Sequence, residues 1–109
     1  MRLRHAPLLI SLAALALVAL SPSAVAKNDP VAGKAMAQKW CSSCHVVDPA
    51  QTGAAPSDVP SFQAIANQEG MTAETIASFI TTPHPPMPDL TLARDQISDL
   101  VAYITSLKK

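Results

Sequence analysis

Near the C-terminus of the chain, apolar residues recur at spacings of three and four, which is the period of one face of a helix. The residues of this face are Ile97, Leu100, Val101, Ile104 and Leu107. The pattern predicts an amphipathic helix that begins near residues 91–93.

A second helix is indicated near residue 30 by its start residues. Asp29 is a preferred N-cap, and Pro30 suits the first helical position because a proline lacks only an N–H that would be unpaired there. The predicted helix runs through Trp40 and brings the chain to Cys41.

The middle of the chain predicts two shorter helices. One covers 62–67 and is closed by Gly70, and the other starts at Thr72 as its cap and runs through Ile80. No stretch alternates apolar and polar residues as a half-buried strand does. We therefore expect an all-α fold.

Two segments contain too many turn formers to be regular elements. Residues 46–60 contain Pro49, Gly53, Pro56 and Pro60, and this density predicts a loop. Residues 82–88 contain four prolines, at positions 83, 85, 86 and 88. Prolines at this density exclude a helix interior or a central strand and favour a stiff segment that holds its side chains in place.

Residues 1–26 differ from the rest of the chain. A basic start with Arg2 and Arg4 precedes the apolar stretch 7–20, and the segment ends in Ala24-Val25-Ala26. This order is typical of a cleaved secretory signal peptide. The alternative is an uncleaved anchor that tethers the same domain to the membrane. Either reading places the working domain, residues 27–109, outside the cytoplasm, and we expect it in the periplasm.

Length and charge limit the possible functions. The 109 residues suffice for one small domain. Residues 27–109 contain six Lys and Arg against eight Asp and Glu, a net charge of −2, which argues against a nucleic-acid partner. No stretch beyond residue 26 is apolar enough to cross a bilayer, so we expect no stable membrane insertion once the signal is removed. We also expect a monomer.

The strongest chemical signal is Cys41-Ser-Ser-Cys44-His45, the attachment motif of c-type haem. Two thiols about one helical turn apart can reach the two vinyl groups of one porphyrin. The adjacent imidazole of His45 then ligates the iron through Nε2, while Nδ1–H donates to an acceptor that fixes the ring. The motif predicts one covalent haem c.

Three other uses of these residues compete with haem attachment. A redox dithiol of thioredoxin type needs a βαβ context that this chain lacks. A disulfide between Cys41 and Cys44 would close a loop too short to constrain the chain. A zinc or copper site would have to combine both cysteines with His45 and His84, but adjacent Cys and His side chains rarely face one metal.

The sixth iron position has several candidates. Met36 lies on the first helix, where a core role is more typical of methionine, and Met71 lies at a helix entrance. Met87 is flanked by prolines that hold its sulfur with little entropy left to lose, so we predict Met87 as the metal ligand beside His45. His84 is the rival ligand in the same segment.

The apolar residues available to cover a haem are few. The chain has only four aromatic residues, and a core this thin commonly needs a covalent or metal staple. The expected haem-packing residues are Phe62, Ile65, Ile76, Phe79, Ile80 and Leu90.

Taken with the motif, the mature chain resembles the class I cytochrome c family. Gly33 occupies the position where that family uses a glycine to let its N- and C-terminal helices cross, and 99–104 resembles the C-terminal helix. The segment 59–62 is similar to the one whose proline carbonyl accepts the proximal His Nδ1–H, which makes Pro60 the orienting residue and Pro56 the fallback. Residues 86–88 are similar to the loop of the methionine ligand.

The resemblance implies a fold of three to five helices wrapped around one haem and a function as a one-electron carrier without substrate chemistry. The implied partners are redox proteins: a periplasmic dehydrogenase or a quinol-oxidising complex, and a terminal oxidase or reductase. Two alternatives stay open, a haem subunit fixed to one enzyme and a haem sensor whose Met87 dissociates. The lysine ring of mitochondrial members is not evident.

Overall fold

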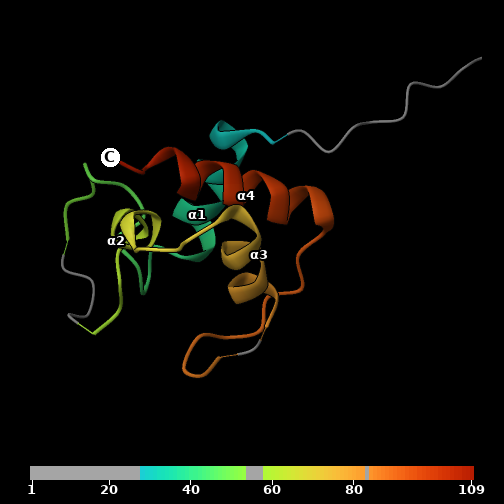
Figure 1. Ribbon diagram of the computed structural model, residues 1–109. Helices are drawn as coiled ribbons and strands as arrows, with labels where there is room; N and C mark the ends of the chain where they lie inside the picture. Colours follow the sequence, from blue (N-terminus) through green and yellow to red (C-terminus); the bar gives the residue numbers. More distant parts are fainter. Residues whose placement is uncertain (1–27, 54–57, 83) are drawn as a thin grey trace, which may run out of the picture.

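The computed structural model describes residues 28–53, 58–82 and 84–109 (Figure 1). Its helices are α1 (Pro30–Trp40), α2 (Phe62–Asn67), α3 (Ala73–Thr81) and α4 (Arg94–Ser106). Within the three described ranges there is no strand, only an isolated bridge between His84 and Met87. The all-α prediction is confirmed. The predicted export signal, Pro56 and Pro83 lie outside the described residues.

The helices begin where the sequence predicted them to begin. The Asp29 carboxylate accepts from the backbone N–H groups of Val31 and Ala32 at the start of α1. The hydroxyls of Ser61 and Thr72 cap α2 and α3 in the same manner. These side chains satisfy N–H groups that no helical carbonyl can reach, which stabilises each start by about 1 kcal/mol.

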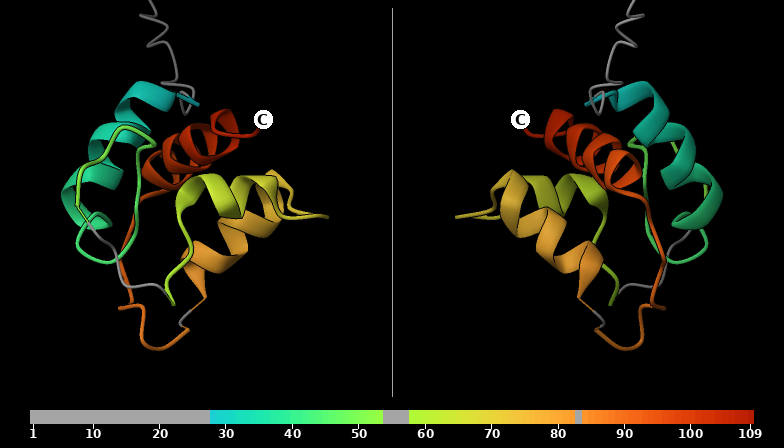
Figure 2. Two further views of the ribbon diagram at one scale, coloured as in Figure 1. Left: turned by 90° about the vertical axis from the view of Figure 1, so that its left-hand side faces the viewer. Right: turned by 90° about the vertical axis from the view of Figure 1, so that its right-hand side faces the viewer.

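Helices α1 and α4 cross at Gly33, and Figures 1 and 2 show them side by side. Gly33 is buried, and a Cβ atom built on it would lie 2.8 Å from the Cβ of Tyr103 and still closer to the carbonyl oxygen of Asp99. The start of α1 is also tied to α4, because the backbone N–H of Asp29 donates to the Asp99 carboxylate over 2.8 Å. The glycine thus permits a backbone approach that any side chain would prevent.

The core lies where α1, α2 and α3 each pack against α4. Its buried residues are Ala37, Val47, Phe62, Ala66, Ile76, Leu100, Tyr103 and Ile104. Of the predicted apolar face of α4, Leu100 and Ile104 are buried and Val101 and Leu107 pack against the core, whereas Ile97 is partly buried outside it. Of the residues expected to pack on a haem, Phe62 and Ile76 are buried, Ile65, Ile80 and Leu90 are partly buried, and Phe79 is 54% exposed.

Candidate functional site

The cysteine motif lies at the C-terminal end of α1. Cys41 is the C-cap residue and donates its backbone N–H to Ala37. The next turn is closed by N–H groups of Cys44 and His45, which donate to the Cys41 carbonyl over 3.1 and 2.8 Å. One compact turn therefore brings both thiols and the imidazole to the same end of one helix.

The environment of the two cysteines does not favour thiolate chemistry. Cys41 is half-buried and Cys44 is exposed. Burial raises the pKa of the Cys41 thiol, and the C-terminal end of a helix disfavours negative charge. Reactive redox dithiols have the opposite setting, a lowered pKa at a helix N-terminus. The structure thus argues against a redox dithiol.

The His45 ring is held in one orientation. Its Nδ1 atom lies 2.7 Å from the carbonyl oxygen of Pro60, and because a carbonyl can only accept, Nδ1 carries the proton and donates. The Phe62 ring lies beside it, with centroids 5.3 Å apart and planes tilted by 52°. In this tautomer Nε2 keeps its lone pair, which is the arrangement of a metal-ligating histidine.

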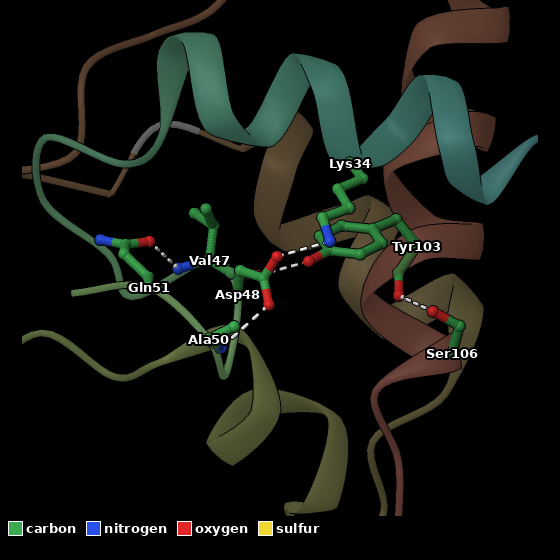
Figure 3. A network of polar contacts seen from close by, with 7 residues as sticks. All are labelled: Lys34, Val47, Asp48, Ala50, Gln51, Tyr103 and Ser106. Atoms are coloured by element: carbon green, nitrogen blue, oxygen red, sulfur yellow. Dashed lines mark hydrogen bonds and ion pairs between the residues drawn. The ribbon is translucent and has the colours of Figure 1, made fainter.

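The chain after His45 is anchored by groups that sequence reasoning missed (Figure 3). The Tyr103 hydroxyl donates to the Val47 carbonyl over 2.7 Å, and Lys34 forms an ion pair with Asp48 at 2.5 Å. Gln51 accepts from the backbone N–H of Val47. The one hint of these contacts in the sequence is the hydroxyl of Tyr103, which stands beside the apolar positions of α4.

Met87 lies in the segment 84–92, which we call the methionine loop and which Figure 1 shows below α3. A turn brings its backbone N–H within 3.1 Å of the His84 carbonyl. His84 donates Nδ1–H to the Thr82 carbonyl over 2.8 Å and meets the Phe79 ring edge-on, with centroids 5.8 Å apart. Both candidate ligands therefore come from one loop.

The three methionines of the described chain differ in their surroundings. Met36 and Met71 are partly buried and pack against the core. Met87 is partly buried outside that cluster. Its thioether is therefore not needed to fill the core, in contrast to the other two.

A simple metal site finds no support in the geometry. Across residues 28–53, 58–82 and 84–109, no group of three or more His, Cys, Asp or Glu side chains could hold a metal ion. A zinc or copper site that joins Cys41, Cys44, His45 and His84 is therefore not formed.

Comparison with known proteins decides how the Cys41–His45 motif is used. Residues 28–104 match the family model described as cytochrome c oxidase, cbb3-type, subunit III. The chain belongs to this family of c-type cytochromes. It is also 43% identical over 91 residues to cytochrome c-552 of Bradyrhizobium diazoefficiens, a match that covers 84% of this chain and 86% of the relative. No solved structure matches it.

The cytochrome is a small class I member that carries covalent haem c and transfers electrons. The residues present suit that group, because the chain has two cysteines in all, at the attachment spacing, and the neighbouring His45 keeps Nε2 available. No helix in the part of the chain that the structure describes is long and apolar enough to cross a membrane.

Proposed function

We propose that the cytochrome is a periplasmic one-electron carrier with His45 and Met87 as the iron ligands and thioether bonds at Cys41 and Cys44. The observation that carries the proposal is the 2.7 Å contact between His45 Nδ1 and the Pro60 carbonyl. It leaves the Nε2 lone pair free for an iron ion, next to the two thiols of Cys41 and Cys44. The bound haem supplies the one-electron couple between ferric and ferrous iron.

Pro60 acts on the iron through the His45 ring. Its carbonyl holds the Nδ1 proton, which makes Nε2 a stronger donor and favours the ferric ion. The neighbouring Phe62 ring is 5% exposed and excludes water from this side of the imidazole. By holding the ring in one orientation, these two residues would keep the reorganisation on electron transfer small.

Met87 would hold the iron together with His45. A thioether favours the ferrous ion and so raises the reduction potential relative to two histidines. Pro86 and Pro88 restrict the backbone on both sides of Met87, so that little conformational entropy is lost when the sulfur binds. With His45 and Met87 both bound to the iron, a substrate would find no free position on it, which suits a carrier better than an enzyme.

Cleavage after Ala26 would release the mature chain, residues 27–109, into the periplasm. There the partners would be a dehydrogenase or quinol-oxidising complex as electron donor and a terminal oxidase or reductase as acceptor. The oxidase named in the family description supports the oxidase as one of them. Contacts of this kind are small and transient.

The first experiment is the visible absorption spectrum of the exported holoprotein in both oxidation states. Sharp reduced α and β bands with a weak far-red oxidised band are expected for His45 and Met87. The reduced protein should also resist carbon monoxide at neutral pH, and Met87→Ala should remove that resistance while His84→Ala leaves it. A spectrum that Met87→Ala does not change would refute the methionine ligand.

A second candidate is a haem subunit fixed to one oxidase, which the family description favours. Stable co-purification of the untagged partner in stoichiometric amounts would support it. A freely diffusing monomer that exchanges electrons with a separate oxidase would support the carrier.

A further inference from the structure

Tyr103 and His45 are far apart in the sequence but are joined by a short chain of aromatic rings. The Phe62 ring centroid lies 5.3 Å from that of His45 and 6.5 Å from that of Tyr103, tilted by 52° and 57° respectively. Phe62 and Tyr103 are each 5% exposed. The proximal imidazole thus rests on a ring that itself rests on α4.

The backbone supplies a second connection between the same residues. The Tyr103 hydroxyl donates to the Val47 carbonyl over 2.7 Å, as Figure 3 shows, and Val47 is only 1% exposed. The preceding carbonyl, of Val46, accepts from the backbone N–H of Phe62 over 3.0 Å. Three consecutive residues are therefore each fixed by a different group: His45 by Pro60, Val46 by Phe62 and Val47 by Tyr103.

We propose that Tyr103 is a positioning residue for the proximal ligand. Its hydroxyl holds residues 45–47 so that His45 Nδ1 keeps its hydrogen bond to Pro60. The inference rests on the proposed ligation by His45. It assigns a role to the turn-rich segment after the cysteine motif, whose first residues link the α1–α4 crossing to the haem site.

The physical reason is that a buried carbonyl without a donor is costly, so the chain moves to satisfy it. Removal of the Tyr103 hydroxyl would leave the Val47 carbonyl buried without a donor, because Val47 lies in the core. The adjoining His45 would then lose its fixed distance to Pro60. A weaker hydrogen bond from His45 Nδ1–H to the Pro60 carbonyl makes Nε2 a poorer electron donor to ferric iron. The reduction potential therefore rises.

The test compares Tyr103→Phe with Ile104→Val in the reduced holoprotein. Tyr103→Phe keeps the ring and removes only the hydroxyl. Ile104→Val removes one methyl group from the next residue of α4, which is 3% exposed and outside both connections. The readouts are exchange of the His45 Nδ1 proton with solvent, measured by NMR, and the reduction potential. Denaturant unfolding records the loss of stability in each variant.

We expect the Nδ1 proton to exchange about tenfold faster in Tyr103→Phe, in keeping with the loss of one supporting hydrogen bond, and the potential to rise. Ile104→Val should leave both values at wild type even where its loss of stability is similar. Equal exchange and potential in Tyr103→Phe and wild type would overturn the inference, as would the same changes in both variants.

If Tyr103→Phe yields no holoprotein, proton exchange in the wild-type holoprotein under rising denaturant provides the deciding measurement. The Tyr103 hydroxyl proton and the His45 Nδ1 proton should exchange through the same opening, with equal free energies. Exchange of the Nδ1 proton through an opening that leaves the Tyr103 hydroxyl protected would refute the inference. Failure of the proposed function has a different signature. If His45 is not a ligand, its ring protons in the wild-type ferric protein will lack the paramagnetic shift of an iron-bound imidazole.

Discussion

The two sides of the proposed haem site are built in different ways. The proximal segment, residues 41–51, is tied to α1 by Lys34 and to α4 by Tyr103, and its histidine is tied to Pro60. The methionine loop bonds within itself and to the end of α3. Across the described residues, no hydrogen bond joins residues 84–92 to α1 or α2.

The comparison shows two ways in which a proposed ligand can be held in place. On the proximal side, packing and hydrogen bonds from helices distant in sequence hold the imidazole. On the methionine side, the rotational restriction is local, because prolines 85, 86 and 88 limit their own φ angles whether or not the chain is folded. The first arrangement depends on the whole fold, whereas the second depends mainly on the loop itself.

The largest difference should come from deleting each ligand in turn. We expect His45→Ala to abolish stable holoprotein, because the proximal ligand joins the covalent attachment to the core. Met87→Ala should keep the folded holoprotein and lower its reduction potential by on the order of 0.1 V. Haem staining, absorption spectra and potentiometry after export provide the measurements. Normal haem incorporation by His45→Ala would contradict the comparison.

The next largest effect is expected at the helix crossing. A Cβ at Gly33 would collide with backbone of α4, so we expect Gly33→Ala to destabilise the holoprotein by about 2–3 kcal/mol. Ala35→Ser, on the exposed side of α1, is the matched control and should stay within about 0.5 kcal/mol. Denaturant unfolding measures both. Equal midpoints would show that the crossing tolerates a side chain.

Much of this arrangement was predictable because its signals are local. The caps at Asp29 and Thr72 and the apolar period of α4 each depend on a few neighbouring residues, and the structure places these helices where the sequence predicted them. The cysteine motif is equally local. Gly33 was assigned to the crossing only through the family resemblance, since nothing in its own neighbourhood names a partner.

The contacts that escaped prediction pair residues distant in sequence. Tyr103 with Val47 and Lys34 with Asp48 depend on how α1 and α4 place the proximal segment, and hydroxyl or charge patterns alone do not specify such partners. The exposure of Phe79 was missed for a related reason. Its spacing from Ile76 and Ile80 left two possible inward faces for α3, and the packing against α4 buries Ile76 most deeply.

A smaller effect should follow from loosening the methionine loop. Pro88 is exposed, so Pro88→Ala changes little packing and mainly widens the conformations open to the chain when Met87 is unbound. This costs roughly 0.4–1 kcal/mol, and the Met87-dissociated fraction should rise roughly two- to fivefold. Carbon monoxide binding to the reduced protein measures that fraction. Pro49→Ala, an exposed proline on the proximal side, should leave it unchanged.

The smallest effect is expected from the ion pair on the proximal side. Its hydrogen bond raises the pKa of Lys34 above 10.5 and, together with the Ala50 N–H, lowers that of Asp48 below 3.8. The lowered pKa of Asp48 stabilises the fold at pH values above the ordinary carboxyl pKa. This stabilisation is lost as the pH falls through the lowered pKa. The raised pKa of Lys34 stabilises the fold at pH values below the ordinary lysine pKa. This contribution is lost as the pH rises through the raised pKa.

The stability difference between wild type and Lys34→Met should therefore be flat from about pH 5 to pH 9 and shrink on either side. Thermal melts across this range measure it. Because 44% of the Lys34 side chain is exposed, salt should also reduce the difference. Loss of the ion pair in Lys34→Met should leave the exchange rate of the His45 Nδ1 proton unchanged, because the Tyr103 hydroxyl still holds Val47. A change in exchange as large as that expected for Tyr103→Phe would show that the ion pair, rather than the hydroxyl, positions the proximal segment.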